Sequence, residues 1–322
     1  MKSGLGITRA PLILGRAQTP TREPSLTPRQ NLDRRGLLHL LVVYVVWGST
    51  YLAIRVAVRE GAGFPPFTMA FMRVLAASAV LLGWAALKGD RLRLTRSEFI
   101  LFMVSGALLW VGGNGLVTWA EMRASSGLAA LLVASMPIWF EVIGTITDRR
   151  RPNPRMVASI LLGFAGVGIL TWPILRTGIR ADILAVVALL LAPLFWAIGS
   201  LWFQRRKPDL SVRAISGWQQ LCGALGFLVV ILLRREPLPT PTTEAWLAWG
   251  YLVVFGSIIA FTSYMSTLRL LPPAIVSTYA YVNPVIAVAL GWLVLREAVT
   301  GYTLAGALLV VGGVAGIFNN RD

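Results

Sequence analysis

Ten long apolar runs follow one another along this chain, and they constrain its fold more than any other feature. A helix needs about 20 apolar residues to cross the hydrocarbon core of a bilayer, within a range of about 17–25. The runs occupy residues 36–57, 66–87, 97–120, 126–147, 155–172, 182–203, 212–233, 245–268, 274–295 and 301–318. The segments between them are too short to hold a folded soluble domain. The sequence therefore predicts an all-α, polytopic protein with ten transmembrane helices in a lipid bilayer.

Composition supports the same class of protein. The chain is 56% hydrophobic and only 14% charged, whereas soluble domains carry about 25% charged residues. Its net charge of +16 fits either nucleic-acid binding or the excess of Lys and Arg in the cytoplasmic loops of membrane proteins. The basic residues stand in short clusters between apolar runs, which favours the loops, so we expect no nucleic-acid partner.

The basic residues also predict an orientation. With the amino terminus in the cytoplasm, 21 of the 30 Lys and Arg residues fall in cytoplasmic segments and seven in external ones, while Arg55 and Arg73 lie within helices. This bias predicts a multi-pass protein of the cell membrane with both termini cytoplasmic. Residues 1–35 are rich in Pro, Thr and Arg and are expected to form a disordered cytoplasmic tail. Such an Arg-rich start also resembles an organelle transit peptide.

The two halves of the chain echo each other at an offset of 147 residues. The matched pairs are Pro137 with Pro284, Gly166 with Gly313 and Arg73 with Gln220. The predicted repeats cover residues 36–174 and 181–319, with five helices each. Five is odd, so the second repeat enters the membrane inverted relative to the first. Inverted repeats are common in secondary transporters, where two similar halves close either mouth of one central site.

Charged residues inside apolar runs are costly and often mark a transport path. Arg73 lies in the second run, Glu121 ends the third and Glu141 lies in the fourth. Two hypotheses compete for Arg73 and Glu141. They form a structural ion pair, or Arg73 meets an anionic group of a solute while Glu141 carries a proton. Glu121 and Glu141 are the candidates for proton coupling, because burial moves the titration of a carboxyl group toward neutral pH.

Polar and aromatic side chains at membrane depth suit the few polar groups of a mostly apolar binding pocket. Together with Arg73, the candidate cavity residues are Trp47, Ser49, Asn114, Tyr264, Tyr281 and Asn283. Pro137 and Pro284 lie inside their runs, where each removes a backbone hydrogen bond and produces either a structural kink or a hinge for gating. Glycines around Gly166 and Gly313 predict close helix packing, and they leave open a homodimer contact.

The residues that a cofactor or an enzyme would need are scarce. The single cysteine, Cys222, and the single histidine, His39, have no partners of metal-ligand type in the sequence. We therefore expect no metal, no cofactor and no enzyme activity. A membrane-embedded or lipid-active enzyme needs a converging set such as an HExxH zinc site. A channel usually builds its filter from rings of carbonyls or charges. The sequence holds neither pattern, and both classes remain alternatives to a transporter.

Several segments resemble a known family. Residues 47–51 read WGSTY and precede Arg73, residues 113–121 read GNGLVTWAE, and residues 279–285 read YAYVNPV. These segments, with FGSIIA at 255–260, resemble the EamA-type transporters of the drug/metabolite transporter superfamily, and the resemblance covers residues 37–318. It implies two repeats around a central cavity that exports small metabolites or drugs.

The chain departs from the family pattern in one place. Members often carry a glutamate after the fourth helix as well as after the ninth. Here Glu297 follows the ninth run, whereas Asp148, Arg149 and Arg150 follow the fourth. The resulting prediction is a secondary transporter, an exporter of a small amino-acid-like or drug-like organic solute, which works by alternating access.

Overall fold

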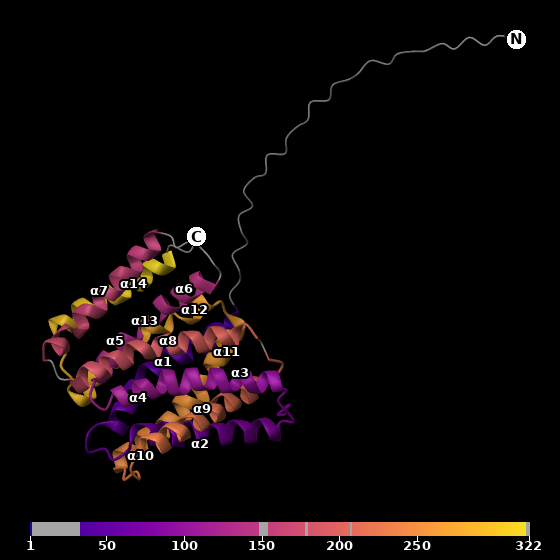
Figure 1. Cartoon of the computed structure of the whole chain (residues 1–322), viewed down its shortest axis with the longest axis horizontal. Coiled ribbons are helices and arrows are strands. Elements are labelled where there is room, and N and C mark those ends of the chain that lie inside the picture. The colour runs from indigo at the N-terminus through magenta and orange to yellow at the C-terminus, as the bar shows by residue number, and fades with distance from the viewer. Residues whose placement is uncertain (2–32, 148–153, 178–179, 207, 320–322) are drawn as a thin grey trace. The chain divides into compact units, whose positions relative to one another are not determined.

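The computed structural model describes Met1 and residues 33–147, 154–177, 180–206 and 208–319, and its secondary structure is helical throughout (Figure 1). In the first half, the elements are α1 (Arg34–Val58), α2 (Pro66–Leu87), α3 (Arg96–Gly106), η1 (Ala107–Gly115), α4 (Leu116–Ala120), α5 (Ser126–Val133), α6 (Met136–Thr147) and α7 (Pro154–Thr177). In the second half, they are α8 (Arg180–Gln204), α9 (Val212–Arg234), α10 (Thr243–Tyr251), η2 (Leu252–Ala260), α11 (Phe261–Leu270), α12 (Pro273–Val276), α13 (Tyr279–Leu295) and α14 (Gly301–Asn319). The segment Asp148–Arg150 lies outside the described residues.

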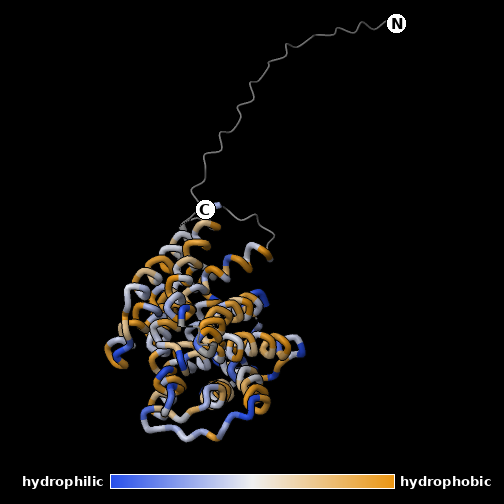
Figure 2. Tube along the Cα trace, turned by 60° about the vertical axis from the view of Figure 1, so that its left-hand side comes forward, coloured by the Kyte–Doolittle hydropathy of each residue, from blue (hydrophilic) through white to orange (hydrophobic). Residues whose placement is uncertain are grey.

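The helices have the dimensions of a membrane protein. Within the described ranges, eight helical segments are long and apolar enough to cross a membrane, and Tyr279–Leu295 and Gly301–Gly313 are shorter apolar helices. Hydrophilic residues gather in the connections and at helix ends, while the helices are mostly apolar (Figure 2). Large apolar side chains such as Leu161 and Leu308 are exposed on the surface, where lipid would cover them. The predicted all-α, polytopic fold class is confirmed.

The two predicted hinge prolines differ in their surroundings. Pro137 was expected inside one helix over 126–147, but that helix is divided, and Pro137 is the second residue of α6. The break at Ala134 and Ser135 has a physical reason, because proline is tolerated in the first turn of a helix but not in its interior. Pro284, by contrast, lies inside α13, and the break in that run falls earlier, before Tyr279.

Two wide helical segments occupy matched places in the third and eighth apolar runs. η1 and η2 are π-helical, each nine residues long, and each is continuous with the α-helices before and after it. π-Helical turns are rare and occur frequently at functional sites. The sequence pattern gave no sign of them. η1 packs against α8 and α9, and η2 packs against α1 and α2, so both lie between the repeats.

The glycines of α7 and α14 serve packing within the chain. A Cβ atom on Gly166 would lie 2.7 Å from the Val310 nitrogen, and one on Gly313 would lie 2.5 Å from the Gly163 nitrogen. Both contacts are too short for any side chain, so glycine permits the close backbone approach. Gly166 and Gly313 therefore account for the close α7–α14 contact.

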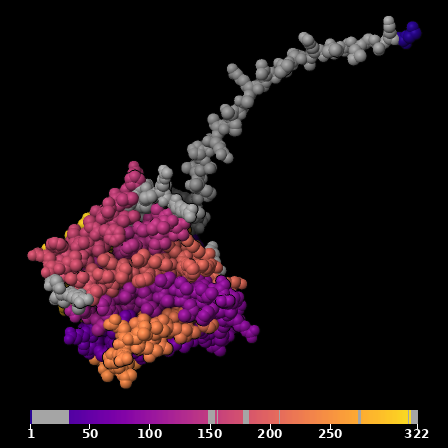
Figure 3. Space-filling view, in the orientation of Figure 1, coloured from indigo at the N-terminus to yellow at the C-terminus, as the bar shows by residue number. Residues whose placement is uncertain are grey.

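A carboxylate joins α2 and α9 at each end of the pair. Asp90, which follows α2, accepts hydrogen bonds from Ser211 Oγ at 2.6 Å and from Arg213 Nε at 3.1 Å. At the other end, Glu236 follows α9 and accepts from the Thr68 nitrogen at 2.7 Å and from Thr68 Oγ1 at 2.8 Å. The helices of the two repeats lie directly against each other here (Figure 3). This helix pair is thus tied at both ends.

Candidate functional site

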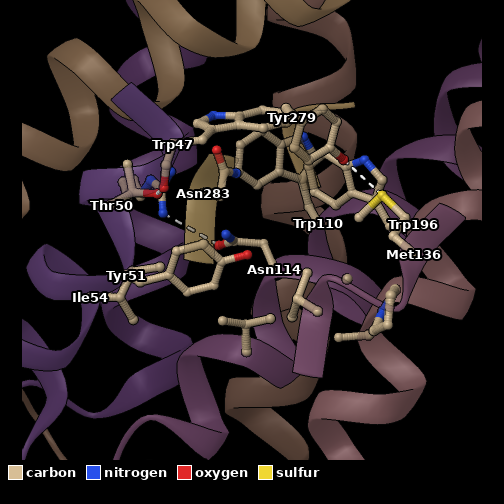
Figure 4. A pocket seen from close by; sticks show the side chains of 16 residues that line it. Trp47, Thr50, Tyr51, Ile54, Trp110, Asn114, Met136, Trp196, Tyr279 and Asn283 are labelled. Atoms are coloured by element: carbon tan, nitrogen blue, oxygen red, sulfur yellow. Dashed lines mark hydrogen bonds between the residues drawn. The ribbon is translucent and has the colours of Figure 1, made fainter. Parts of the chain in front are cut away.

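A cavity in the middle of the bundle is lined by both repeats. Its empty volume is about 580 Å³. α1, α2, η1, α4, α5 and α6 contribute from the first repeat, and α8 and α13 contribute from the second. Figure 4 shows the lining side chains pointing toward one another from these elements. The lining is mostly apolar and aromatic with a few polar groups, which is typical of pockets for small organic molecules.

Aromatic rings form most of one wall. The Trp47 ring lies 5.4 Å from that of Trp196 and 5.2 Å from that of Tyr279, and both pairs meet edge to face. Behind them, Tyr264 is fully buried and accepts a hydrogen bond from Trp196 Nε1 at 3.0 Å. Its hydroxyl also lies 2.7 Å from Ser200 Oγ. Tyr264 therefore holds the wall in place and does not line the cavity, contrary to the prediction.

Arg73 brings a positive charge to this apolar site. The residue is only 2% exposed. Its Nε donates to Ser257 Oγ at 2.8 Å, its Nη1 donates to Asn114 Oδ1 at 3.5 Å, and its guanidinium carbon lies 5.7 Å from the centre of the Trp110 ring. Among the described residues, no ion pair includes Arg73. The hypothesis of an ion pair with Glu141 is therefore wrong, since Arg73 bonds only neutral groups.

The two asparagines reach the cavity from different repeats. Asn114 comes from η1, and Asn283 comes from α13, just before Pro284. With its amide oriented to satisfy its neighbours, Asn283 donates to the carbonyl oxygens of Tyr44 and Tyr279, each at 3.2 Å. An amide held in this way ties α13 to α1 and leaves its oxygen available as an acceptor.

The structure brings together some of the predicted cavity residues and separates others. Trp47, Arg73, Asn114 and Asn283 line the cavity. Ser49, Tyr264 and Tyr281 do not. The polar and aromatic lining residues that sequence reasoning missed are Thr50, Tyr51, Trp110, Trp196 and Tyr279.

Helical spacing explains two of the errors. Ser49 lies two residues after Trp47, on the opposite face of α1, where its Oγ lies 2.6 Å from the Tyr251 hydroxyl. Tyr281 lies between Tyr279 and Asn283, which share one face of α13 because they are four residues apart. The same spacing rule predicts Thr50, Tyr51 and Tyr279 as lining residues, so it is the signal that could have found them.

The candidate coupling carboxylates differ in burial. Glu121 is fully buried, and neither of its carboxyl oxygens has a hydrogen-bond partner among the described residues. It is the first residue after the span Arg96–Ala120. Burial, reinforced by the negative charge of Glu297, raises its pKa well above the usual value. Glu141, on α6, is half-buried and lies outside the cavity lining.

Glu297 holds the beginning of α5. Its carboxylate accepts hydrogen bonds from the Ser126 nitrogen at 2.9 Å, from Ser126 Oγ at 2.8 Å and from the Gly127 nitrogen at 3.2 Å. A helix leaves its first N–H groups without partners inside the helix, and an anion is favourable there. We call this arrangement the Glu297 clamp. It joins the α13–α14 connection of one repeat to α5 of the other.

Two repeats of apolar helices around a central cavity, with a buried arginine in its lining, form the architecture of a membrane transporter. The chain belongs to the EamA-like transporter family, whose model matches residues 34–172 and again residues 183–319. The predicted family is thereby confirmed, and the protein is a membrane transporter rather than an enzyme.

Individual relatives agree with this class. The chain is 34% identical over 267 residues to the inner membrane transporter YedA of Escherichia coli strain K12, covering 82% of this chain and 83% of that one. It is 25% identical over 289 residues to a probable amino-acid metabolite efflux pump of Salmonella typhimurium, covering 87% and 93%. A solved crystal structure with 23% identity has a similar fold, with a TM-score of 0.63 over 87% of this chain and 95% of that one.

Proposed function

We propose that this protein is a secondary transporter that exports a small, amino-acid-like organic acid across the cell membrane by alternating access. The observation that carries the proposal is the buried Arg73 side chain, which faces the cavity and bonds only neutral groups. A guanidinium group matches a carboxylate well, because it presents several N–H donors in one plane.

The remaining wall suits the apolar body of such a solute. Trp47, Trp110 and Trp196 supply large flat surfaces, and Tyr51 and Asn283 supply a few polar atoms. A pocket of this composition binds mainly through apolar contact and orients its ligand through a small number of polar groups. Arg73 would hold the carboxylate while the indole rings cover the rest of the molecule.

Alternating access needs elements that can bend. The fourth run is interrupted at Ala134 and Ser135, just ahead of Pro137, and Pro284 removes one backbone bond within α13. Weak points in the corresponding runs of both repeats suit hinges that open one mouth of the cavity while closing the other. We therefore retain Pro137 and Pro284 as proposed hinge residues.

The proposed topology and the proposed direction rest on different observations. The distribution of Lys and Arg favours cytoplasmic termini. The Salmonella typhimurium relative bears the name of a probable amino-acid metabolite efflux pump, which favours export.

Counterflow in proteoliposomes tests the proposal. Purified protein is reconstituted and loaded with pooled amino acids and their N-acetyl derivatives, and uptake of each radiolabelled solute is measured. A transporter gives saturable counterflow, whereas a channel gives none. Asn114→Ala and Asn283→Ala should each lower the rate.

A matched pair of variants locates the site. Tyr279→Phe removes a hydroxyl that lines the cavity and donates to Met136 Sδ at 2.7 Å. Tyr281→Phe makes the same change two residues away, outside the lining. The proposal expects the first to alter KM or kcat and the second to leave both unchanged. Equal effects, or no counterflow of any pooled solute, would contradict it.

A further inference from the structure

Glu121 is a buried acid that solute binding alone does not explain. It is fully buried, and both of its carboxyl oxygens lack hydrogen-bond donors among the described residues. An ionised carboxylate in such a place loses its hydration and gains no hydrogen bond in return. Its ionised form therefore depends on nearby positive charges.

Charged and titratable groups on neighbouring elements act on Glu121. They are Tyr51 and Arg55 on α1, Arg73 on α2 and Glu297 after α13. The Arg55 Nη1 donates to the backbone oxygen of Glu121 and not to its carboxyl group. Both arginines attract the Glu121 charge, while Glu297 repels it.

Arg73 is the charged group that Glu121 and the cavity share. Among the sixteen lining residues, all of them described, Arg73 is the only charged one. Its recorded hydrogen bonds use two of its five N–H donors. Glu121 lies outside the lining, yet close enough for the two charges to attract each other.

We propose that Glu121 carries a proton together with the solute, because the Glu121 carboxylate and the solute carboxylate compete for the single Arg73 guanidinium. This inference rests on the proposed transport of an organic acid through the cavity. A buried site is costly when its net charge is unbalanced. In the empty carrier, ionised Glu121 balances Arg73. In the loaded carrier, the solute anion balances Arg73 and Glu121 is neutral.

The direction of proton movement follows from this balance. When the solute anion binds Arg73, Glu121 takes one proton from water on the same side of the membrane. After the cavity reopens on the other side, the anion leaves, Glu121 releases the proton there, and its negative charge again balances that of Arg73. One monoanion and one proton therefore cross together, in the same direction and without net charge. An organic acid that accumulates in the cytoplasm would leave down its own gradient by this route.

The same balance predicts the charge of the solute. A cavity with one cation and no lining carboxylate suits a monoanion better than a zwitterion, whose ammonium group would face Arg73 without an acceptor of opposite charge. N-acetyl-leucine and leucine separate the two classes, because they share a side chain and a carboxylate and differ in the ammonium group.

The test measures protons and solute together. Proteoliposomes holding the full-length protein and a pH-sensitive dye are loaded with radiolabelled N-acetyl-leucine or leucine, and efflux is started by dilution. We expect N-acetyl-leucine efflux to make the lumen alkaline by about one proton per solute, at a rate that a valinomycin-set potential does not change.

Variants then assign the proton to a residue. In Glu121→Gln, the number of protons moved per solute should fall at least about fivefold, and efflux should become sensitive to the membrane potential because the anion now crosses alone. Glu121→Asp keeps a titratable group and should restore part of the ratio. Glu141→Gln makes the same change in the other candidate acid and should leave the ratio unchanged.

The possible results are distinct. Absence of counterflow for every pooled solute refutes the proposed transport itself. Solute movement without protons in the wild-type protein overturns the inference and leaves transport standing, and this holds even if no Glu121 variant folds. Undiminished proton movement in Glu121→Gln, loss of it in Glu141→Gln, or transport of leucine without N-acetyl-leucine would each overturn the inference as well.

Discussion

Glu121 and Glu297 lie at the same end of the bundle, and their surroundings are opposite. Glu297 accepts three hydrogen bonds from the first turn of α5. Glu121 is fully buried with no donor to its carboxyl oxygens among the described residues. The difference teaches that a position at this end of the bundle does not by itself assign a role to an acid. The available N–H groups decide whether a carboxylate holds the structure or is free to exchange a proton.

Removing the Glu297 clamp should give the largest effect on stability. Glu297→Ala leaves three donors at the beginning of α5 without their acceptor, and we expect the free energy of unfolding to fall by about 2–4 kcal/mol. Denaturation in mixed detergent micelles measures it. Glu121→Ala serves as the comparison and should cost less, because no hydrogen bond to its carboxyl group is lost. Equal losses would end the distinction between the two acids.

A methyl group added at Gly291 should also disturb the Glu297 clamp. A Cβ atom on Gly291 would lie 2.3 Å from Glu297 Oε2 and 2.7 Å from Ser126 Oγ. Gly291→Ala therefore forces the carboxylate away from α5, and we expect a loss of about 1–3 kcal/mol. Gly301→Ala is the control, since no atom lies within 4 Å of its Cβ position. A Gly291→Ala protein as stable as the wild type would show that the clamp contributes little.

The pH dependence of stability should identify Glu121. Its pKa in the folded protein is raised above the ordinary value of 4.5. The folded state therefore binds more protons than the unfolded state above that pH, and stability falls as the pH rises from about 4.5 toward the folded pKa. Glu121→Gln should remove this decline and be more stable than the wild type at alkaline pH. A decline that persists in the variant would place the titrating group elsewhere.

Asp90 should have the smallest effect on stability, and its contribution should rise with pH instead of falling. Its pKa is lowered, first by the hydrogen bond from Ser211 and then by Arg213. A lowered pKa adds stability above about pH 4, and this contribution disappears as the pH falls through the folded pKa. Because Asp90 is near the surface, solvent screening keeps the effect small. In thermal melts, Asp90→Asn should differ more from the wild type at pH 7 than at pH 3.

The fold was predictable because the bilayer imposes it. Apolar runs near 20 residues located the helices within a few residues of their observed ends, as in α9, which begins at Val212 as expected. The breaks within the fourth and ninth runs were not predicted. Nor were the π-helical segments, because no pattern of side chains distinguishes a wide turn from an α-helical one.

The site was only partly predictable. Residue type alone found Arg73 and Asn283, whose polar groups are conspicuous at membrane depth. Residue type alone failed where the face of the helix decides whether a side chain lines the cavity, as at Ser49 and Tyr281. The Glu297 clamp joins residues 171 positions apart, and only the packed structure brings them together.

The wide turns of η1 and η2 also bear on how these chains change length during evolution. A π-helical turn holds one residue more than the α-helical turn it replaces, so a one-residue deletion there is absorbed locally. The flanking helices α3 and α4, or α10 and α11, keep their ends and their neighbours. A relative that lacks one residue inside Ala107–Gly115 or Leu252–Ala260 should therefore keep the same helix packing.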